Sequence, residues 1–476
     1  MIHHALRAAG ALAALAGLLS GGAAAAQTPG ASGDGAHRGY LAAQLTDGGQ
    51  LRVIEELNAD RLFVPASVLK LATIAAALEH LGAEYRWTTR LVARGAVDGA
   101  VLAGDLVVEP GADPTWGPDG GGDAAMAALA EQVRARGITR IAGDLAVDMG
   151  RFPGRLHPLD REYGDLPYAH GTPAAPLAID DAAITVRVGP GTAIGNPARV
   201  RAPEGIEVIN RTITVGQDRH GSGTLDFLPV WETDTLVLRG EYPISEPAAT
   251  VTASDPAPAR RAAERLRHAL GEAGVTVDGG LVFQRQAAAG ESAVLAEYRS
   301  PPLAELLAPI LTDSRNWYAD MLILALAREV AGSGRFDDGV EVIAALLAAL
   351  PGAASGGLPE PSLLDGSGLS PANLVSPAAV VQLLAYALEQ SWGATLIEAL
   401  PAPGEGTLAA WPRLPPLSAK TGTLRHTVAL SGILDPGSDA AVIFCYFINH
   451  HPEQRTASRR EIADALGRWR ASADGR

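Results

Sequence analysis

The sequence predicts an α/β protein in which an antiparallel sheet, flanked by helices, is interrupted by a large and mainly β insertion. Strand-like segments lie near both ends of the chain, and helical segments lie between them. From about residue 91 to residue 289, the chain instead alternates short strand-like runs with turns rich in Gly, Pro and Asp. With 476 residues, the chain is long enough for two or more domains, each with its own core.

The expected sheet-bearing domain consists of residues 27–90 and 290–476. It begins with a hairpin, in which strands at 40–45 and 51–57 flank a turn at 47–49. A three-stranded antiparallel meander is expected near the other end, with strands at 417–424, 428–434 and 440–448. Apolar residues that recur with a helical period predict helices at 66–81, 302–311, 317–330, 340–350, 377–388 and 459–471.

The expected insertion, residues 91–289, is a mainly β module. Runs of β-branched and aromatic residues between turn signals predict strands at 102–109, 140–148, 183–188, 235–239 and 279–285. Two helices are expected within it, at 124–136 and 258–273.

The first 26 residues have the pattern of a Sec-type signal peptide. Arg7 precedes an apolar stretch at 8–19, and the segment ends in the small residues 24–26. This predicts export from the cytoplasm and cleavage after residue 26. No cysteine follows the cleavage point to carry a lipid, and no other stretch is long enough to span a bilayer.

The net charge of −15 argues against nucleic acid or anionic lipid as a partner. Cys445 is the only cysteine, and it lies in an apolar run, so we expect a buried core residue rather than a nucleophile. An exported protein without disulfide pairs fits a bacterial envelope enzyme with a full hydrophobic core. The sequence carries no signal for an oligomeric state.

The chain contains only two lysines, Lys70 and Lys420, whereas 36 of its 38 basic residues are arginine. Arginine cannot release its proton, but lysine can act as a base or as a compact point charge. Lys70 follows Ser67 by three residues at the start of the helix 66–81, which is apolar nearly all round and should be buried. Burial lowers the pKa of a lysine, so Ser67 and Lys70 form a candidate nucleophile and base.

Three short motifs contain these residues. Ser67-x-x-Lys70 comes first, Ser314-x-Asn316 lies in a loop between expected helices, and Lys420-Thr421-Gly422-Thr423 lies on an expected strand. Each motif alone is weak, because such short patterns occur by chance. Together and in this order they resemble the signature of active-site-serine penicillin-binding proteins and β-lactamases.

The large insertion between the first two motifs narrows the resemblance. The loop 365–370, with the sequence Asp-Gly-Ser-Gly-Leu-Ser, and the segment from Gly143 through Asp148 to Phe152 are similar to those of the D-alanyl-D-alanine carboxypeptidase/endopeptidase family of class C penicillin-binding proteins, peptidase family S13. The resemblance implies a β-lactamase/transpeptidase-like domain and a periplasmic enzyme. It also implies peptidoglycan stem peptides as substrates, β-lactam antibiotics as inhibitors, and no cofactor or metal.

The implied chemistry begins with attack by Ser67 on a carbonyl carbon, which forms an acyl-enzyme. Lys70 accepts the Ser67 proton, Ser314 relays a proton towards the leaving amine, and Asn316 hydrogen-bonds the substrate amide. The backbone N–H groups of Ser67 and Thr423 form the oxyanion hole.

Substrate binding is assigned mainly to the third motif. Lys420 supplies positive charge for a terminal carboxylate, and the Thr421 and Thr423 hydroxyls are additional donors. Gly422 allows the substrate backbone to approach the strand edge.

Further substrate contacts are expected from Asp148, Phe152 and Arg425. The related family often has a basic residue after the glycine-rich loop, where this chain has Pro371, and an amide where it has Arg425. In the resembling proteins these positions touch the distal part of the stem peptide, so the specificity for its third residue stays open. Asp148 fits a turn residue at a strand end equally well.

Three other readings compete with a D,D-peptidase. A β-lactamase has the same motifs but no long insertion, and a catalytically inactive peptidoglycan-binding scaffold would retain remnants of them. A metalloprotease is disfavoured because the chain has no His-Glu-x-x-His motif. The preference between carboxypeptidase and endopeptidase activity stays open.

Overall fold

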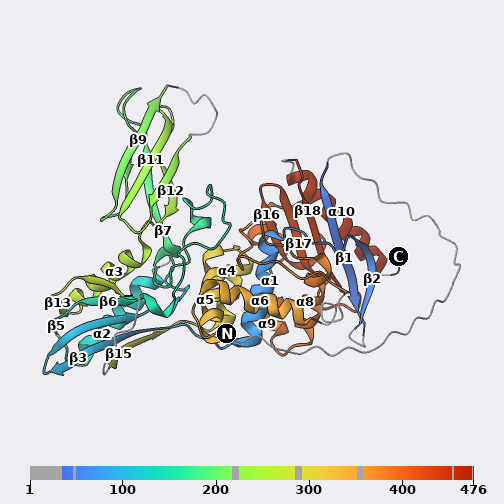
Figure 1. Ribbon diagram of the computed structural model, residues 1–476. Coiled ribbons are helices and arrows are strands. Elements are labelled where there is room, and N and C mark those ends of the chain that lie inside the picture. Colours follow the sequence, from blue (N-terminus) through green and yellow to red (C-terminus); the bar gives the residue numbers. More distant parts are fainter. Residues whose placement is uncertain are drawn as a thin grey trace, which may run out of the picture.

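The computed structural model describes residues 35–46, 50–118, 120–216, 224–284, 292–350, 357–452, 455–473 and 475. The expected signal peptide and the turn at 47–49 lie outside these residues. Figure 1 shows the five-stranded sheet with its helices at one end of the molecule and the inserted β-sheets at the other.

Both ends of the chain contribute to one five-stranded sheet, as the sequence predicts. Its order is β16 (Leu417–Leu424), β17 (Thr427–Leu434), β18 (Val442–Asn449), β1 (His37–Leu45) and β2 (Leu51–Leu57). All neighbours are antiparallel, and the pairing of β1 with β18 places Leu41 opposite Cys445. This pairing places β1 and β2 in the same sheet as β16, which carries the third motif. The segment that follows β2 and leads to Ser67 therefore lies in the same domain as that motif.

The sheet is covered on both faces, which explains why β18 is buried along its whole length. Side chains alternate along β1: Leu41 joins the core under α1, whereas Tyr40 and Ala42 join the core under the C-terminal helix. Cys445 is buried in the core under α1, where the sequence analysis expects a core residue. The helices of this domain are η1 (Ala66–Leu69), α1 (Lys70–His80), η5 (Leu303–Leu306), α4 (Leu307–Leu311), α5 (Asn316–Glu329), α6 (Phe336–Ala349), α8 (Pro377–Glu389), α9 (Gly393–Glu398), η6 (Gly406–Ala410) and α10 (Arg455–Ala473).

Helix α1 is the centre of this domain. It packs against α5, α6 and α8, and every residue from Lys70 to Leu78 is buried. The sequence predicts this burial, because an apolar surface all round a helix requires partners all round.

The inserted region contains three sheets. A seven-stranded sheet carries β3 (Thr88–Asp98), β4 (Val101–Glu109), β5 (Arg140–Ile141), β6 (Leu145–Asp148), β13 (Thr276–Val277), β14 (Leu281–Gln284) and β15 (Ser292–Arg299). Two three-stranded sheets contain β7 (Ala183–Gly189), β8 (Arg199–Arg201), β12 (Ala249–Ser254), and β9 (Glu207–Val215), β10 (Asp226–Val230), β11 (Thr235–Pro243). Helices α2 (Gly121–Ala135) and α3 (Pro258–Glu272) lie against the large sheet, and three short helices, η2 (Met149–Arg151), η3 (Ala169–Gly171) and η4 (Asp180–Ala182), complete the region.

Two features of the inserted region differ from the sequence-based expectation. The strand expected at 140–148 is two short strands, β5 and β6, which pair in parallel with different parts of β4. Strand β15 pairs with β3, so the large sheet includes residues on both sides of the expected insertion, from 88 to 299. Strands such as β9 escaped prediction because most of their side chains are exposed and show no apolar alternation.

The segment that leads into Ser67 is attached to the sheet by one side chain. Asn449, at the end of β18, accepts a hydrogen bond from the Val64 N–H (2.8 Å) and donates one to the Val64 carbonyl (3.1 Å). Asn449 is 4% exposed, so water does not readily replace these two bonds.

We therefore expect Asn449→Ala to lower the free energy of unfolding by about 1–3 kcal/mol, because two backbone groups of the partly buried Val64 lose their partners. Urea denaturation measures the change. A loss below about 0.5 kcal/mol would contradict a structural role for this contact.

Candidate active site

Ser67 lies on a tight turn immediately before α1. Ala66, the preceding residue, has a left-handed backbone (φ 47°), which is rare for a residue with a side chain. Such strain persists only where the surroundings enforce it, and it is common at functional sites. Here the loop 365–370 packs closely against the turn, since a Cβ atom on Gly368 would lie 1.9 Å from the Ala66 carbonyl oxygen.

The Lys70 amine is buried and makes three short contacts. Its Nζ lies 3.0 Å from Ser67 Oγ, 2.7 Å from Asn316 Oδ1 and 2.5 Å from the Ser367 carbonyl oxygen. The side chain is fully shielded from solvent. Ser67 and Lys70, the candidate nucleophile and base, therefore lie at hydrogen-bond distance from each other.

Burial lowers the pKa of Lys70 to about 7. The nearby carboxylates of Asp365 and Asp320 oppose this effect, and the guanidinium of Arg161 reinforces it. A lysine with this pKa is substantially neutral near pH 7, so it can accept the proton of Ser67.

The second motif supplies contacts to both lysines. Ser314 has a left-handed backbone (φ 60°) just before α5, and its hydroxyl accepts a hydrogen bond from Lys420 Nζ (2.9 Å). Asn316, the first residue of α5, accepts from Lys70 and donates through Nδ2 to the carbonyl of His170 (2.8 Å). The motif thus connects Lys70 with Lys420, so the structure brings the two lysines of the chain to one site.

The third motif lies on β16 as expected, but its lysine does not reach the surface. Lys420 is fully buried and donates to Ser314 and to the Thr421 carbonyl oxygen (3.0 Å). Burial, with the nearby amine of Lys70, lowers the pKa of Lys420 well below its usual value. Thr421 and Thr423 line the pocket, and the Thr421 hydroxyl bonds that of Thr407 (2.6 Å).

Gly422, expected to let the substrate backbone approach the strand edge, also lies in close contact with the turn before α1. A Cβ atom there would lie 2.7 Å from the carbonyl oxygen of Pro65 and 3.1 Å from the Cβ atom of Ala66. Glycine therefore allows β16 to approach the turn that carries Ser67.

The loop 365–370 is organised around one buried carboxylate. Asp365 accepts hydrogen bonds from the backbone N–H groups of Gly368 (2.8 Å) and Ser370 (2.9 Å) and from the Asn373 amide (2.8 Å). These bonds fix the loop, whose Ser367 carbonyl holds Lys70.

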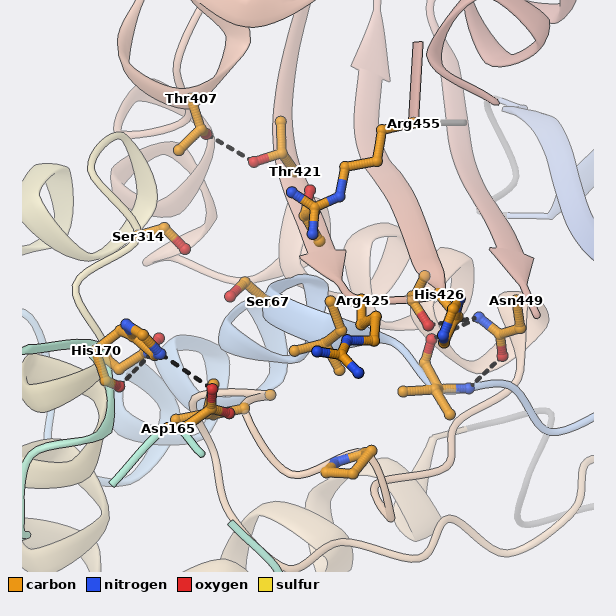
Figure 2. A pocket seen from close by; sticks show the side chains of 18 of the residues that line it. Ser67, Asp165, His170, Ser314, Thr407, Thr421, Arg425, His426, Asn449 and Arg455 are labelled. Atoms are coloured by element: carbon orange, nitrogen blue, oxygen red, sulfur yellow. Dashed lines mark hydrogen bonds and ion pairs between the residues drawn. The ribbon is translucent and has the colours of Figure 1, made fainter. Parts of the chain in front are cut away.

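A pocket of about 850 Å³ opens at Ser67. Figure 2 shows the Ser67 hydroxyl directed into it, with Ser314, His170 and Asp165 on one side and Thr421 and Arg455 on the other. Of the residues assigned from the sequence, the pocket is lined by Ser67, Ser314, Asn316, Thr421, Thr423 and Arg425.

Asp148 and Phe152 are not among the residues at this pocket, and their expected contact with substrate stays a prediction. Asp148 is 3% exposed, and its carboxylate accepts the N–H of Gly150, so it is the strand-end turn residue that the sequence left open. Phe152 packs into the hydrophobic core that surrounds α1. Neither lines the pocket at Ser67.

Several pocket residues escaped the sequence analysis. Arg455 and Arg459 come from α10, while Glu162, Asp165 and His170 come from the inserted region. They belong to no motif, and only the fold brings them to Ser67. The one available signal for the arginines is their closeness in sequence at the start of an amphipathic helix.

Among the described residues, no group of three His, Cys, Asp or Glu side chains is arranged to hold a metal ion. Within that same part of the chain, none of the helices has the length and apolar character that a membrane-spanning segment requires.

Comparison with known proteins gives a family match over nearly the whole chain. Residues 31–473 match the model of the D-Ala-D-Ala carboxypeptidase 3 (S13) family. The D-alanyl-D-alanine carboxypeptidase of Actinomadura sp. (strain R39) is 34% identical over 408 residues, which cover 82% of this chain and 73% of the relative. The D-alanyl-D-alanine carboxypeptidase DacB of Haemophilus influenzae is 26% identical over 432 residues, covering 87% and 86%.

Solved structures agree at the level of the fold. The crystal structure of penicillin binding protein 4 (dacB) from Haemophilus influenzae superimposes with a TM-score of 0.79 at 24% identity, covering 93% of this chain and 96% of that one. The same protein in complex with a novel β-lactam gives a TM-score of 0.75 over the same shares of the chains, at 23% identity.

The lowered pKa of Lys70 predicts a pH-dependent stability. Between pH 7 and pH 9 the unfolded chain binds a proton at this lysine that the folded chain does not bind, so its contribution to stability rises with pH. Relative to Lys70→Met, wild type should gain about 2 kcal/mol of unfolding free energy over this range. Urea denaturation of both proteins at the two pH values measures this gain, and equal differences at both pH values would contradict the lowered pKa.

Proposed function

Because the chain belongs to the D-Ala-D-Ala carboxypeptidase 3 (S13) family, we propose that it is a serine D,D-peptidase that hydrolyses peptidoglycan stem peptides. The family resemblance seen in the three motifs is thereby confirmed. The observation that carries the proposal is the 3.0 Å contact between Ser67 Oγ and the amine of Lys70, whose pKa is lowered to about 7.

In the first half of the reaction, neutral Lys70 accepts the Ser67 proton while Oγ bonds to the carbonyl carbon of the penultimate D-Ala. The C–N bond then breaks, and the leaving amine takes up a proton. Ser314 lines the same pocket, and its hydroxyl, which is hydrogen-bonded to Lys420, can pass this proton to the leaving amine. Water then attacks the ester carbonyl while Lys70 accepts its proton, and Lys70 returns that proton to Ser67 Oγ as the acid product leaves.

Asn316 has two functions in this scheme. Its Oδ1 holds the amine of Lys70, and its position at the pocket wall leaves it within reach of a substrate amide. The backbone N–H groups of Ser67 and Thr423 are the proposed oxyanion hole, since both residues line the same pocket.

The substrate is a peptide that ends in D-Ala-D-Ala, or a crosslink in which D-Ala is joined to diaminopimelate. A β-lactam reacts at the same serine and leaves a slowly hydrolysed ester. The sequence pattern of residues 1–26 supports export to the periplasm, where these substrates occur.

We assign the peptidase domain to residues 27–90 and 290–476 and the inserted module to 91–289. The pairing of β3 with β15 supports junctions nearer 88 and 299.

The charge that binds the substrate carboxylate is proposed to come from α10. Lys420, expected to supply it, is buried with a lowered pKa and is a weak source of positive charge for the pocket. Arg455 is exposed, lines the pocket and has no acidic partner among the described residues. Arg459, one turn further along α10, has its guanidinium 5.6 Å from the ring centre of Trp411. Lys420 then acts on the proton pathway through Ser314.

The peptidase assignment predicts a covalent penicillin adduct on Ser67. Intact-mass measurement after incubation with penicillin should show one stable adduct, which Ser67→Ala abolishes. Lys70→Arg should fold but react at least 100-fold more slowly, because guanidinium cannot accept the proton. Rapid turnover of penicillin would identify a β-lactamase, and no adduct on wild type would identify an inactive scaffold. Digestion of peptidoglycan, assayed for free D-Ala and cleaved dimers, separates the two peptidase activities.

A carboxylate site at Arg455 predicts selective loss of one substrate. Arg455→Leu should lower kcat/KM about tenfold for a peptide that ends in a free D-Ala carboxylate, because a charge-assisted hydrogen bond is lost. The same peptide with a C-terminal carboxamide should be affected less than twofold. Arg460→Leu is the matched control, since Arg460 is exposed on the same helix and does not line the pocket. Equal losses for both peptides would refute the assignment.

A further inference from the structure

The inserted region contacts the second motif and the first turns of α5 at three points. Asn316 donates to the carbonyl of His170, which lies on η3. Arg315 pairs with Asp181 on η4 (Nε–Oδ2 2.9 Å). One turn further along α5, Asp320 pairs with Arg161. Residues of the inserted module therefore bind the beginning of α5, which carries Asn316.

The Arg161–Asp320 pair is the most buried of these contacts. Arg161 Nη2 lies 2.5 Å from Asp320 Oδ2, and the two side chains are 1% and 0% exposed. Arg161 Nη1 also donates to the carbonyl of Thr172 (2.8 Å), just after the turn whose His170 carbonyl holds Asn316. One guanidinium thus joins α5 to the segment 170–172, and that segment orients the amide of Asn316.

The pair is poorly suited to stabilise the fold. Arg161 Nε and Asp320 Oδ1 are buried and make no hydrogen bond within the described part of the chain. Removing two charges from water is costly, and incompletely bonded buried pairs rarely repay that cost. The location of the pair near Lys70 suggests a different role, because both charges affect the pKa of the Lys70 amine.

We propose that Arg161 of the inserted module and Asp320 of α5 are positioning residues that hold Asn316 against Lys70 and set the charge balance around its amine. The module is then a part of the catalytic centre rather than a separate appendage. The inference rests on the proposed function, since it concerns the reactivity of Ser67.

Four charged groups surround Lys70 on the elements packed against it. Asp320 on α5 and Asp365 in the loop before α8 favour the protonated amine, whereas Arg161 from the module disfavours it. Lys420 on β16 is the fourth, and the two amines disfavour each other's protonation. Loss of the Asp320 charge therefore lowers the pKa of Lys70, and subsequent loss of Arg161 raises it again.

The test is the pH profile of Ser67 acylation by a fluorescent penicillin, measured as a second-order rate constant from pH 5 to pH 9. Asp320→Asn keeps an acceptor for Arg161, so the rising limb should move to lower pH by about half a unit or more while the plateau stays within threefold. Adding Arg161→Met should return the limb towards its wild-type position. It should also lower the plateau about tenfold, because Asn316 loses its support.

Arg140→Met is the matched control. Arg140 forms an exposed ion pair with Asp278 in the same module (2.7 Å), and its loss should leave both limb and plateau unchanged.

If the rising limb of the pH profile lies at the same pH in wild type and Asp320→Asn, the proposed effect of these charges on Lys70 is wrong. If the plateau rate is unchanged in the double variant, the proposed positioning of Asn316 is wrong. If the double variant fails to fold in a thermal melt, the limb of Asp320→Asn alone decides. Absence of any adduct on wild type would instead count against the proposed peptidase, so the two failures are distinct.

Discussion

Lys70 carries the only amine on α1, and the fold takes that amine out of water while giving it acceptors from three different elements. Ser67 Oγ, Asn316 Oδ1 and the Ser367 carbonyl oxygen surround it within 3.0 Å. Each acceptor requires its own support: a strained turn at Ala66, the start of α5, and a loop organised by Asp365. Burial then provides what these contacts alone would not, a lysine that can release its proton near neutral pH.

The two lysines lie at one site but have different charged neighbours. Lys70 faces two carboxylates that partly offset its desolvation, whereas Lys420 is buried next to another amine. A buried Lys420 with a lowered pKa suits the proposed proton movement through Ser314 better than carboxylate binding, which we assign to the exposed Arg455 at the start of α10. The proposed difference in role agrees with the composition of the chain, in which arginine supplies nearly all the basic residues and the two lysines lie at the proposed active site.

The sequence was sufficient to predict the sheet, the buried helix and the three motifs, because periodicity and scarce lysines are local signals. The apolar surface around α1 requires burial, and the strands near both chain ends contain runs of apolar residues. The rest depends on tertiary contacts. Asp148 accepts a hydrogen bond within a turn, Gly422 allows β16 to approach Pro65, and Arg161, Asp320 and Arg455 belong to no motif. Strand β9 is too exposed to show an apolar face.

The most direct test of a deprotonated Lys70 exploits the fact that the chain has only two lysines. In protein labelled with ¹³C and ¹⁵N at lysine, the Cε and Nζ signals of each can be followed by NMR as the pH is raised. One signal, absent from Lys70→Arg, should have its titration midpoint close to pH 7. A Lys70 signal that titrates only at about pH 10, as in an exposed lysine, would show that the folded protein keeps this amine protonated at neutral pH.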